Sequence, residues 1–315
     1  MADAYGMDSI TLGNAVALAK FLYNRGIISK EDTGGLSLDW ENVEAQQELI
    51  HQIAMREGFG NIVAEGMHGL AQVINKGAME YCYHVKGFSR GVYPPGVFAL
   101  AHATSTRGAD HLRARSWRGG IRDPELYARL VEIGEVPADM TQEPEKWMGI
   151  MERVATVADL VSRCKGAVNT WICAAPLAWK YSRLFQGIAL LLEKATGIPF
   201  TASEIEHAAD RVYLLEMAFN ARQGITREAD RLVQKPDVRE TPEGEQQRQK
   251  HGEMLTEYYR AHGCDIQTGI PTRQALERLN LKYVADELEA HGPYPCWSGA
   301  PLWPREKYPH GGKRF

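Results

Sequence analysis

The sequence lacks the features that define several large classes of protein. It contains no run of about 18 apolar residues, so no membrane span is predicted. The residues after Met1 are neither basic nor continuously apolar, so no signal peptide is predicted. Neither sign of charge is in large excess, since 36 Lys and Arg against 40 Asp and Glu give a net charge of −4. Nucleic-acid binding needs a clear basic excess. We therefore expect a cytoplasmic globular protein that binds neither nucleic acid nor membrane.

Cysteine is scarce and dispersed. The five cysteines form no Cys-x-x-Cys pair, and their number is odd. The sequence therefore predicts no disulfide framework. The chain alone therefore carries no recognisable zinc or iron–sulfur site. A single cysteine can still be one ligand of a site that another segment completes; the alternative is a small buried apolar residue. The five positions are Cys82, Cys164, Cys173, Cys264 and Cys296.

Apolar residues recur mainly at helical spacing, so the chain is predicted to be mostly α-helical. Ser203 and Glu206 are predicted to form a capping box at the start of one helix. The other predicted helices cover 11–25, 42–57, 62–74, a segment to about 133 that Asp123 caps and Pro124 begins, 144–164, 245–262 and 272–279. Residues 81–85 alternate weakly, as in a strand, and 235–249 is predicted to be a solvated loop.

The segment 88–120 differs from the rest of the chain because it is rich in Gly and Arg. We expect it to be irregular and too polar for core packing, and long irregular segments often carry function. His111 lies within it, and its titration range suits proton transfer near neutral pH. The alternative is a structural histidine bonded to a loop carbonyl.

Two short segments share a pattern in which an aspartate is followed by a small residue at the third position and a possible ligand at the fifth. One runs from Asp3 through Gly6 to Asp8. The other runs from Asp159 through Ser162 to Cys164. A carboxylate can accept two parallel N–H bonds from a flat heterocycle, and a small residue lets backbone approach it. A thiolate can bind a metal cluster. The alternative is an aspartate that caps a helix beside a turn residue.

A further pair, Glu48 and His51, lies at helical spacing on one face. Such a pair can supply two metal ligands, but no second copy is present, and a surface pair is the alternative.

With these residues in view, nearly the whole chain resembles the C-terminal part of the aldehyde ferredoxin oxidoreductase family, the tungsten (or molybdenum) bis-pyranopterin enzymes. The matching segments are 3–14, 26–32, 56–66, 84–87, 103–113, 159–164, 219–230, 258–260 and 268–273. The resemblance implies a helical domain 2 over 1–90 and a helical domain 3 with an extended tail over 91–315. The family's N-terminal β-rich pterin-binding domain is not in this sequence.

The resemblance also implies roles for single residues. Asp3 and Asp159 would bind pterin N–H groups, with Gly6 and Ser162 admitting the backbone. Asp8 is grouped with these cofactor-binding positions. Cys164 would be the fourth ligand of a [4Fe–4S] cluster, with Cys173 as a less favoured substitute. His111 would assist proton transfer near the metal.

The implied activity is oxidation of aldehydes to carboxylic acids, with electrons passing through tungsten and the cluster to ferredoxin or an iron–sulfur subunit. An N-terminal half or partner subunit would complete the site. One alternative is a benzoyl-CoA-reductase-type tungsten subunit that acts on an aryl-CoA. The other is a non-catalytic helical remnant or scaffold.

Three further departures from the family pattern bear on these expectations. Ser162 stands where the family usually has Gly, so its Cβ must be tolerated. The segment 93–96 differs from the family's usual Asp-Pro-Arg, which puts the substrate class in question. The tail from His291 is predicted to wrap a surface and to serve a partner interface.

Overall fold

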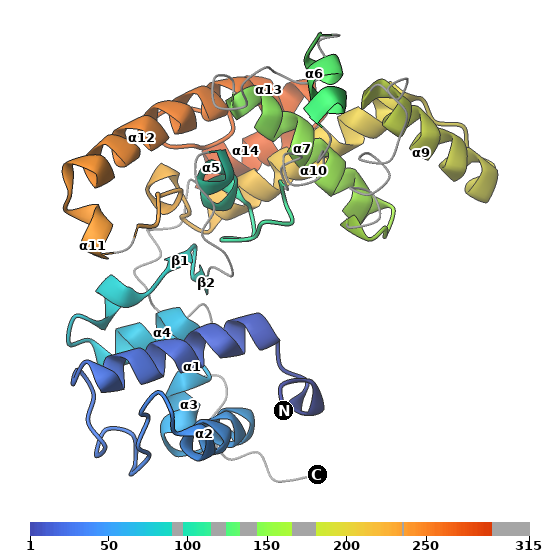
Figure 1. Cartoon of the computed structure of the whole chain (residues 1–315). Coiled ribbons are helices and arrows are strands. Elements are labelled where there is room, and N and C mark those ends of the chain that lie inside the picture. The colour runs from blue at the N-terminus through green and yellow to red at the C-terminus, as the bar shows by residue number, and fades with distance from the viewer. Residues whose placement is uncertain (90–96, 115–123, 133–143, 166–180, 235, 292–315) are drawn as a thin grey trace. The chain divides into compact units, whose positions relative to one another are not determined.

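A computed structural model describes residues 1–89, 97–114, 124–132, 144–165, 181–234 and 236–291 (Figure 1). The described chain is mostly helical, as the spacing of its apolar residues predicts. The segment 93–96, Asp123, Cys173 and the tail from 292 lie outside the described residues, and so do the predictions made for them. No helix in the described part is both long and apolar enough to span a membrane.

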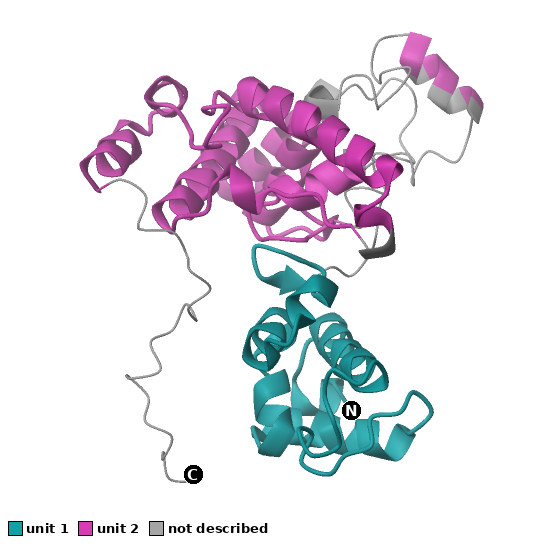
Figure 2. Ribbon diagram, turned by 90° about the vertical axis from the view of Figure 1, so that its left-hand side faces the viewer, with its two compact units in different colours: residues 1–91, 295–315 teal, residues 92–294 magenta. Residues whose placement is uncertain are grey.

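The chain forms two compact units, one up to Gly91 and the other comprising Val92–Tyr294 (Figure 2). Each has its own hydrophobic core. We refer to them as unit 1 and unit 2.

Unit 1 is a small helical assembly built around α1. Its elements are η1 (Asp3–Tyr5), α1 (Ser9–Asn24), α2 (Val43–Met55), α3 (Gly58–Val63), α4 (Gly66–Ile74), η2 (Ala78–Tyr81), β1 (His84–Val85) and β2 (Phe88–Ser89). The two strands pair antiparallel, with His84 opposite Ser89. The core of unit 1 consists of fully buried leucines and their neighbours, and α1 packs on α4 while α2 packs on α3. Those leucines are Leu22, Leu38, Leu49 and Leu70.

The helix predicted over 62–74 is wrong in one respect, because the structure has two helices, α3 and α4. The break comes at Gly66, whose φ of 76° is left-handed and cannot continue an α-helix. Periodicity alone did not detect it, since apolar residues on the two short helices mimic one continuous stripe.

Unit 2 is built on three long helices: α7 packs against both α10 and α12, and α9 packs beside α10. Its elements are α5 (Val97–Thr104), α6 (Pro124–Glu132), α7 (Pro144–Leu160), α9 (Tyr181–Thr196), α10 (Ala202–Arg222), η4 (Arg227–Ala229), α11 (Pro236–Arg239), α12 (Pro242–His262), α13 (Arg273–Arg278) and α14 (Lys282–His291). The core contains Phe185, Tyr213, Tyr258 and Leu276.

The predicted capping box at Ser203 and Glu206 is wrong by two residues. Thr201 is the N-cap of α10, and its hydroxyl oxygen accepts from the Glu204 N–H at 3.2 Å. The Glu204 carboxylate in turn accepts from the Thr201 N–H at 2.7 Å. Thr201 with Glu204 and Ser203 with Glu206 both have the spacing of a capping box. Which of the two begins the helix depends on where the preceding loop ends.

Other boundaries also differ from prediction. The segment 88–120 is not wholly irregular, because α5 lies within it and Leu100 is fully buried in the core. The predicted loop 235–249 contains α11 and the start of α12, where Thr241 caps the helix and Pro242 is its first residue. Helix α7 ends at Leu160, four residues before Cys164, and α14 was not predicted.

Candidate functional site

Both aspartates predicted to bind pterin lie on turns with the same backbone conformation. Gly6 adopts the left-handed conformation with φ of 66°, and its N–H donates to the Asp3 carbonyl at 3.1 Å. Ser162 adopts it with φ of 53°, and its N–H donates to the Asp159 carbonyl at 3.0 Å. The shared sequence pattern therefore corresponds to a shared local structure, one copy in each unit.

A second hydrogen bond completes the match. The Met7 N–H donates to the Ala2 carbonyl at 3.0 Å, and the Arg163 N–H donates to the Ala158 carbonyl at 2.7 Å. These are the two bonds of a Schellman motif, which ends a helix and favours Gly at its left-handed position. The motif explains the small residue at Gly6 and at Ser162 without any ligand.

The motif does not explain the aspartate. Asp159 is the penultimate residue of α7, where the exposed carbonyl groups make the helix end electronegative. A carboxylate there is locally unfavourable unless it has a partner. The helix-capping alternative considered from the sequence therefore fails for Asp159, and its side chain has another role.

Two cations hold Asp159 in place. The Arg113 guanidinium lies 2.7 Å from Asp159 Oδ2, and the Lys165 ammonium lies 2.9 Å from the same oxygen. Arg113 is 3% exposed, whereas Asp159 is 45% exposed. Within the described residues no hydrogen bond or ion pair is formed by the other oxygen, Oδ1, so the two cations bind one oxygen of a half-exposed carboxylate.

Arg113 is itself fixed by a second acid. Its other terminal nitrogen forms an ion pair with Glu216 of α10, and Glu216 also accepts from the Thr106 hydroxyl at 2.6 Å. Asn220 donates to the Thr106 carbonyl at 2.8 Å. The loop that follows α5 is therefore tied to both α7 and α10 through buried or half-buried polar contacts.

His111 lies two residues before Arg113 in that same loop and is half-buried. Its ring centroid is 6.3 Å from that of His102, a buried histidine on α5. The histidine predicted to transfer a proton therefore belongs to the same loop as the arginine that contacts Asp159. His102 was not singled out from the sequence.

Cys164 lies two residues past the left-handed turn, with its side chain exposed. Lys165, the next residue, is already helical. Cys82 and Cys264 are instead buried, in agreement with the apolar alternative considered for them. Within the described residues, no group of three or more His, Cys, Asp and Glu side chains is arranged to hold a metal ion.

The unit 1 copy has a simpler environment. Asp3 is exposed, and a Cβ at Gly6 would meet nothing within 4 Å, so the backbone there is open. Asp8 is the N-cap of α1 and accepts from the Thr11 N–H at 2.6 Å. This backbone hydrogen bond lowers the pKa of Asp8. One oxygen of Asp8 therefore has a structural role.

Glu48 and His51 also have local partners. The Tyr5 hydroxyl lies 2.9 Å from His51 Nδ1, and Gln52 donates to Glu48 at 3.0 Å. These contacts agree with the surface-pair alternative and tie the Asp3 turn to α2. That Asp3, His111, Asp159 and Cys164 meet around one cofactor stays a prediction, because Asp3 belongs to unit 1 and the others to unit 2.

Comparison with known proteins decides the family. The family described as "Aldehyde ferredoxin oxidoreductase, domains 2 & 3" matches residues 1–281. The chain belongs to the aldehyde ferredoxin oxidoreductase family. Both the resemblance noted in the sequence and the mostly helical fold expected from it are confirmed.

Curated relatives in the aldehyde ferredoxin oxidoreductase family support the assignment. The tungsten-containing aldehyde ferredoxin oxidoreductase of Pyrococcus horikoshii is 30% identical over 290 residues, covering 89% of this chain and 44% of the relative. That of Pyrococcus abyssi is 30% identical over 292 residues, with the same coverage. An aliphatic sulfonate oxidoreductase, WOR-like subunit, of Pyrococcus furiosus is 30% identical over 177 residues, covering 47% of this chain and 28% of that one. The chain therefore spans less than half the length of these relatives.

A solved structure has the same fold. The active site complex BamBC of benzoyl coenzyme A reductase, in complex with 1,5-dienoyl-CoA, superposes with a TM-score of 0.74 at 22% identity. The match covers 92% of this chain and 46% of that one. This likeness establishes the fold.

Proposed function

We propose that the chain is the C-terminal part of a tungsten or molybdenum pterin oxidoreductase that oxidises aldehydes to carboxylic acids. The observation that carries the proposal is the exposed aspartate on each of two turns that share one backbone conformation. An N-terminal half or partner subunit supplies the remainder, which agrees with the 44% coverage of the relatives.

The residues present fit such a cofactor. Asp3 is exposed beside the open backbone of Gly6, and Asp159 is half-exposed with one oxygen bound by cations. Carboxylates oriented in this way can accept N–H bonds from a pterin ring. Cys164 offers an exposed thiol, the ligand type that an iron–sulfur cluster requires. Asp8 contributes less directly, since it caps α1.

In the oxidation of an aldehyde, water supplies the oxygen atom, and the products are a carboxylic acid, two protons and two electrons. The bound tungsten pterin would accept the electrons, and a [4Fe–4S] cluster would pass them to ferredoxin or an iron–sulfur subunit. We assign His111 to accept and release a proton at its imidazole nitrogen. Arg113 and Lys165 hold the Asp159 carboxylate in one orientation.

One alternative reaction competes with aldehyde oxidation, namely the reduction of an aryl-CoA. The benzoyl coenzyme A reductase complex has this fold, but its identity of 22% carries no activity across. We favour the aldehyde because relatives that match 89% of the chain are named for that substrate. Assays of the assembled enzyme with aldehydes and with an aryl-CoA separate the two.

The test is co-expression of the chain with an N-terminal half of the family, followed by metal analysis. We expect stoichiometric tungsten or molybdenum together with iron. A stable complex that contains none of these metals would refute the proposal and favour the scaffold alternative.

Variants of the same complex test the individual residues. Asp159→Asn should lower tungsten content, while Asp39→Asn, a change at another exposed aspartate, should leave it unchanged. Cys164→Ser should lower iron content, and Cys173→Ser should not. Equal loss in both members of either pair contradicts the assigned roles.

A further inference from the structure

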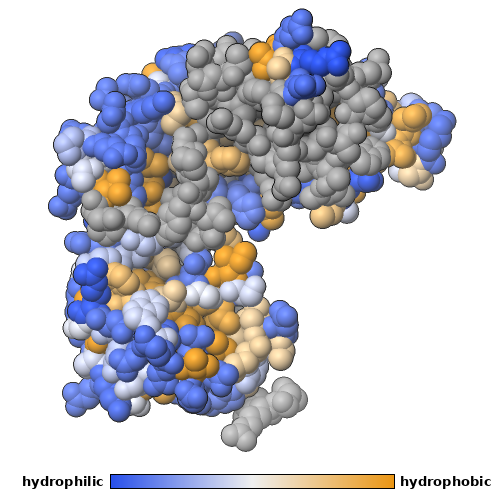
Figure 3. Space-filling model, viewed as in Figure 1, coloured by the Kyte–Doolittle hydropathy of each residue, from blue (hydrophilic) through white to orange (hydrophobic). Residues whose placement is uncertain are grey.

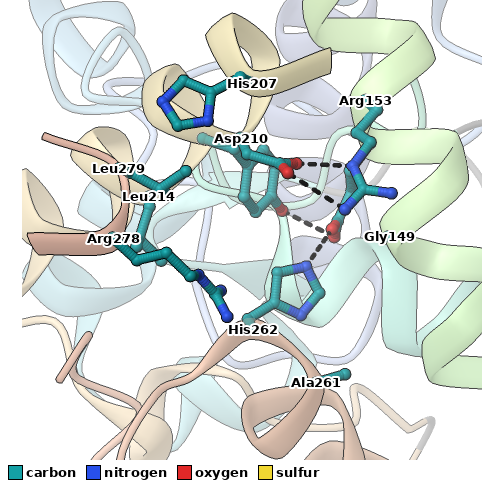
Figure 4. A pocket seen from close by; sticks show the side chains of 11 residues that line it. Gly149, Arg153, His207, Asp210, Leu214, Ala261, His262, Arg278 and Leu279 are labelled. Carbon is teal, nitrogen blue, oxygen red and sulfur yellow. Dashed lines mark hydrogen bonds and ion pairs between the residues drawn. The ribbon is translucent and has the colours of Figure 1, made fainter. Parts of the chain in front are cut away.

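Unit 2 contains a pocket of about 590 Å³ that none of the roles above uses (Figure 4). It lies between α7, α10, α12 and the end of α13. Glu152, on α7, lines it and stands seven residues before Asp159, which is about 10 Å along the helix axis. Asp159, Arg113 and Lys165 do not line the pocket, which has the size of a site for a small molecule.

The two acids in the pocket already have partners. Asp210 of α10 receives two hydrogen bonds from Arg153 of α7, at 2.6 and 3.1 Å. Glu152 is 2% exposed and accepts from the hydroxyls of Tyr213 and Tyr258, each at 2.8 Å. Both carboxylates that line the pocket therefore already accept hydrogen bonds from other residues of the protein.

The two ring nitrogens of His262 each face a protein oxygen. Its Nδ1 lies 2.8 Å from the Tyr258 carbonyl oxygen, which can only accept, so this nitrogen carries a proton. Its Nε2 lies 2.7 Å from Glu152, so a proton on this nitrogen forms a hydrogen-bonded ion pair with the Glu152 carboxylate. Burial lowers the pKa of His262, but the charge and hydrogen bond of Glu152 outweigh it, and the pKa is raised overall.

Arg278 adds a cation without an acidic partner. Within the described part of the chain no acid pairs with its guanidinium group, which points into the pocket toward His262 (Figure 4). Leu214 and Leu279 lie beside it and form an apolar wall. His207 lines the pocket farther away. Glu206 acts electrostatically on Arg153 but does not line the pocket.

We propose that this pocket binds a small organic carboxylate, with the carboxylate paired to the Arg278 guanidinium and a short apolar body against Leu214 and Leu279. A guanidinium fork matches the geometry of a carboxylate, and the apolar wall favours an organic acid over an inorganic anion. The inference rests on unit 2 alone and does not depend on the proposed oxidoreductase activity.

The experiment is a titration of the full chain with butyrate, benzoate and inorganic phosphate, followed through the imidazole NMR signals of His262 and His207. We expect saturable binding of the two organic acids and a larger shift at His262 than at His207. Arg278→Gln should weaken binding by about tenfold, the value of one charge-assisted contact.

Arg260→Gln is the matched control, because Arg260 is exposed on α12 and pairs only with Glu257 among the described residues. It should leave binding unchanged. Failure to saturate, equal weakening in both variants, or tighter binding of phosphate than of the organic acids would each overturn the proposal. Failure of metal loading in the co-expression experiment would leave this result unaffected, so the two proposals are tested separately.

Discussion

Ser162 is a single side chain in a backbone conformation that glycine prefers. Its φ of 53° places it in the left-handed region, where Gly6 stands in the other copy of the turn with φ of 66°. A Cβ in this region clashes with the local carbonyl oxygen. The serine is therefore tolerated at an energetic cost, and the departure from the family pattern noted in the sequence has a definite structural meaning.

Exchanging these two residues tests that cost. Ser162→Gly should raise the free energy of unfolding by about 0.5–1 kcal/mol, since relief of strain outweighs the added freedom of glycine in the unfolded chain. Gly6→Ser should lower it by a similar amount, because a Cβ there meets nothing within 4 Å and only the backbone strain changes. Chemical denaturation measures both. A stabilised Gly6→Ser variant would contradict the explanation.

His262 makes the stability of the chain depend on pH. Although burial opposes it, Glu152 raises the pKa of His262 above the ordinary 6.5. Stabilisation from this proton is then fully present below pH 6.5 and is lost as the pH rises through the folded-state pKa. The contribution of His251 to stability changes with pH in the opposite direction, because burial lowers the pKa of this histidine. Its contribution is lost as the pH falls below 6.5.

Glu152→Gln isolates the His262 contribution. The variant should be less stable than wild type at pH 6 by about 3 kcal/mol, because it leaves a buried cation without its partner. The difference between the two proteins should shrink as the pH rises from 6.5 to 9. Denaturation at several pH values checks this, and His251 cancels in the difference. A gap that widens with pH would contradict the assigned ion pair.

The end of α7 and the start of α10 are each fixed by a local hydrogen-bonded motif. The Schellman turn ends α7 at Leu160 and carries the chain from Asp159 past Cys164 to a new helical residue at Lys165. Thr201 begins α10, and farther along this helix Glu216 pairs with Arg113 and Tyr213 is buried. Phe219, on the same helix, is 64% exposed.

The observed and the expected caps of α10 can be told apart by two alanine substitutions. Thr201→Ala should lower the free energy of unfolding by about 1 kcal/mol, because both bonds of the capping box are lost. Ser203→Ala should change it by less than about 0.5 kcal/mol, because Ser203 is exposed within the helix. Thermal or urea unfolding gives both values. The reverse order would restore the cap predicted from the sequence.

Considered as a whole, the molecule has two separate hydrophobic cores. Among the described residues, the buried core of unit 1 lies between Ala15 and Cys82, and that of unit 2 lies between Leu100 and Ala285. Large apolar side chains also stay exposed in the second half of α9 and the turn after it, a region that is orange in Figure 3. They are Leu190, Leu191, Ile198 and Phe200. An exposed apolar face is what we expect where a partner is to be bound.

Because its core is self-contained, unit 1 should fold alone. A fragment of residues 1–91 should show helical circular dichroism and one cooperative unfolding transition. The substitution Leu49→Ala within the fragment should lower its stability by about 2–5 kcal/mol, as expected for a fully buried leucine. A fragment without a cooperative transition would show that unit 1 needs the rest of the chain.

Local sequence determined much of what was expected of this protein. Apolar spacing predicted most of the long helices, and the repeated aspartate pattern predicted two related turns, because both features depend on residues within one or two turns of each other. The ordered motifs led to the family. Element ends were less accurate at Gly66, Thr201 and Leu160, where two local signals compete and packing selects one.

Only the tertiary structure decided which side chains meet. Arg113 was part of a recognised motif, yet its contacts with Asp159 and Glu216 join positions 46 and 103 residues away. Glu152 and His262 are 110 residues apart, and neither lies in a motif. Such pairs form because buried charges must be neutralised by whatever the packed helices bring close, and that proximity is a property of the whole fold rather than of any short segment.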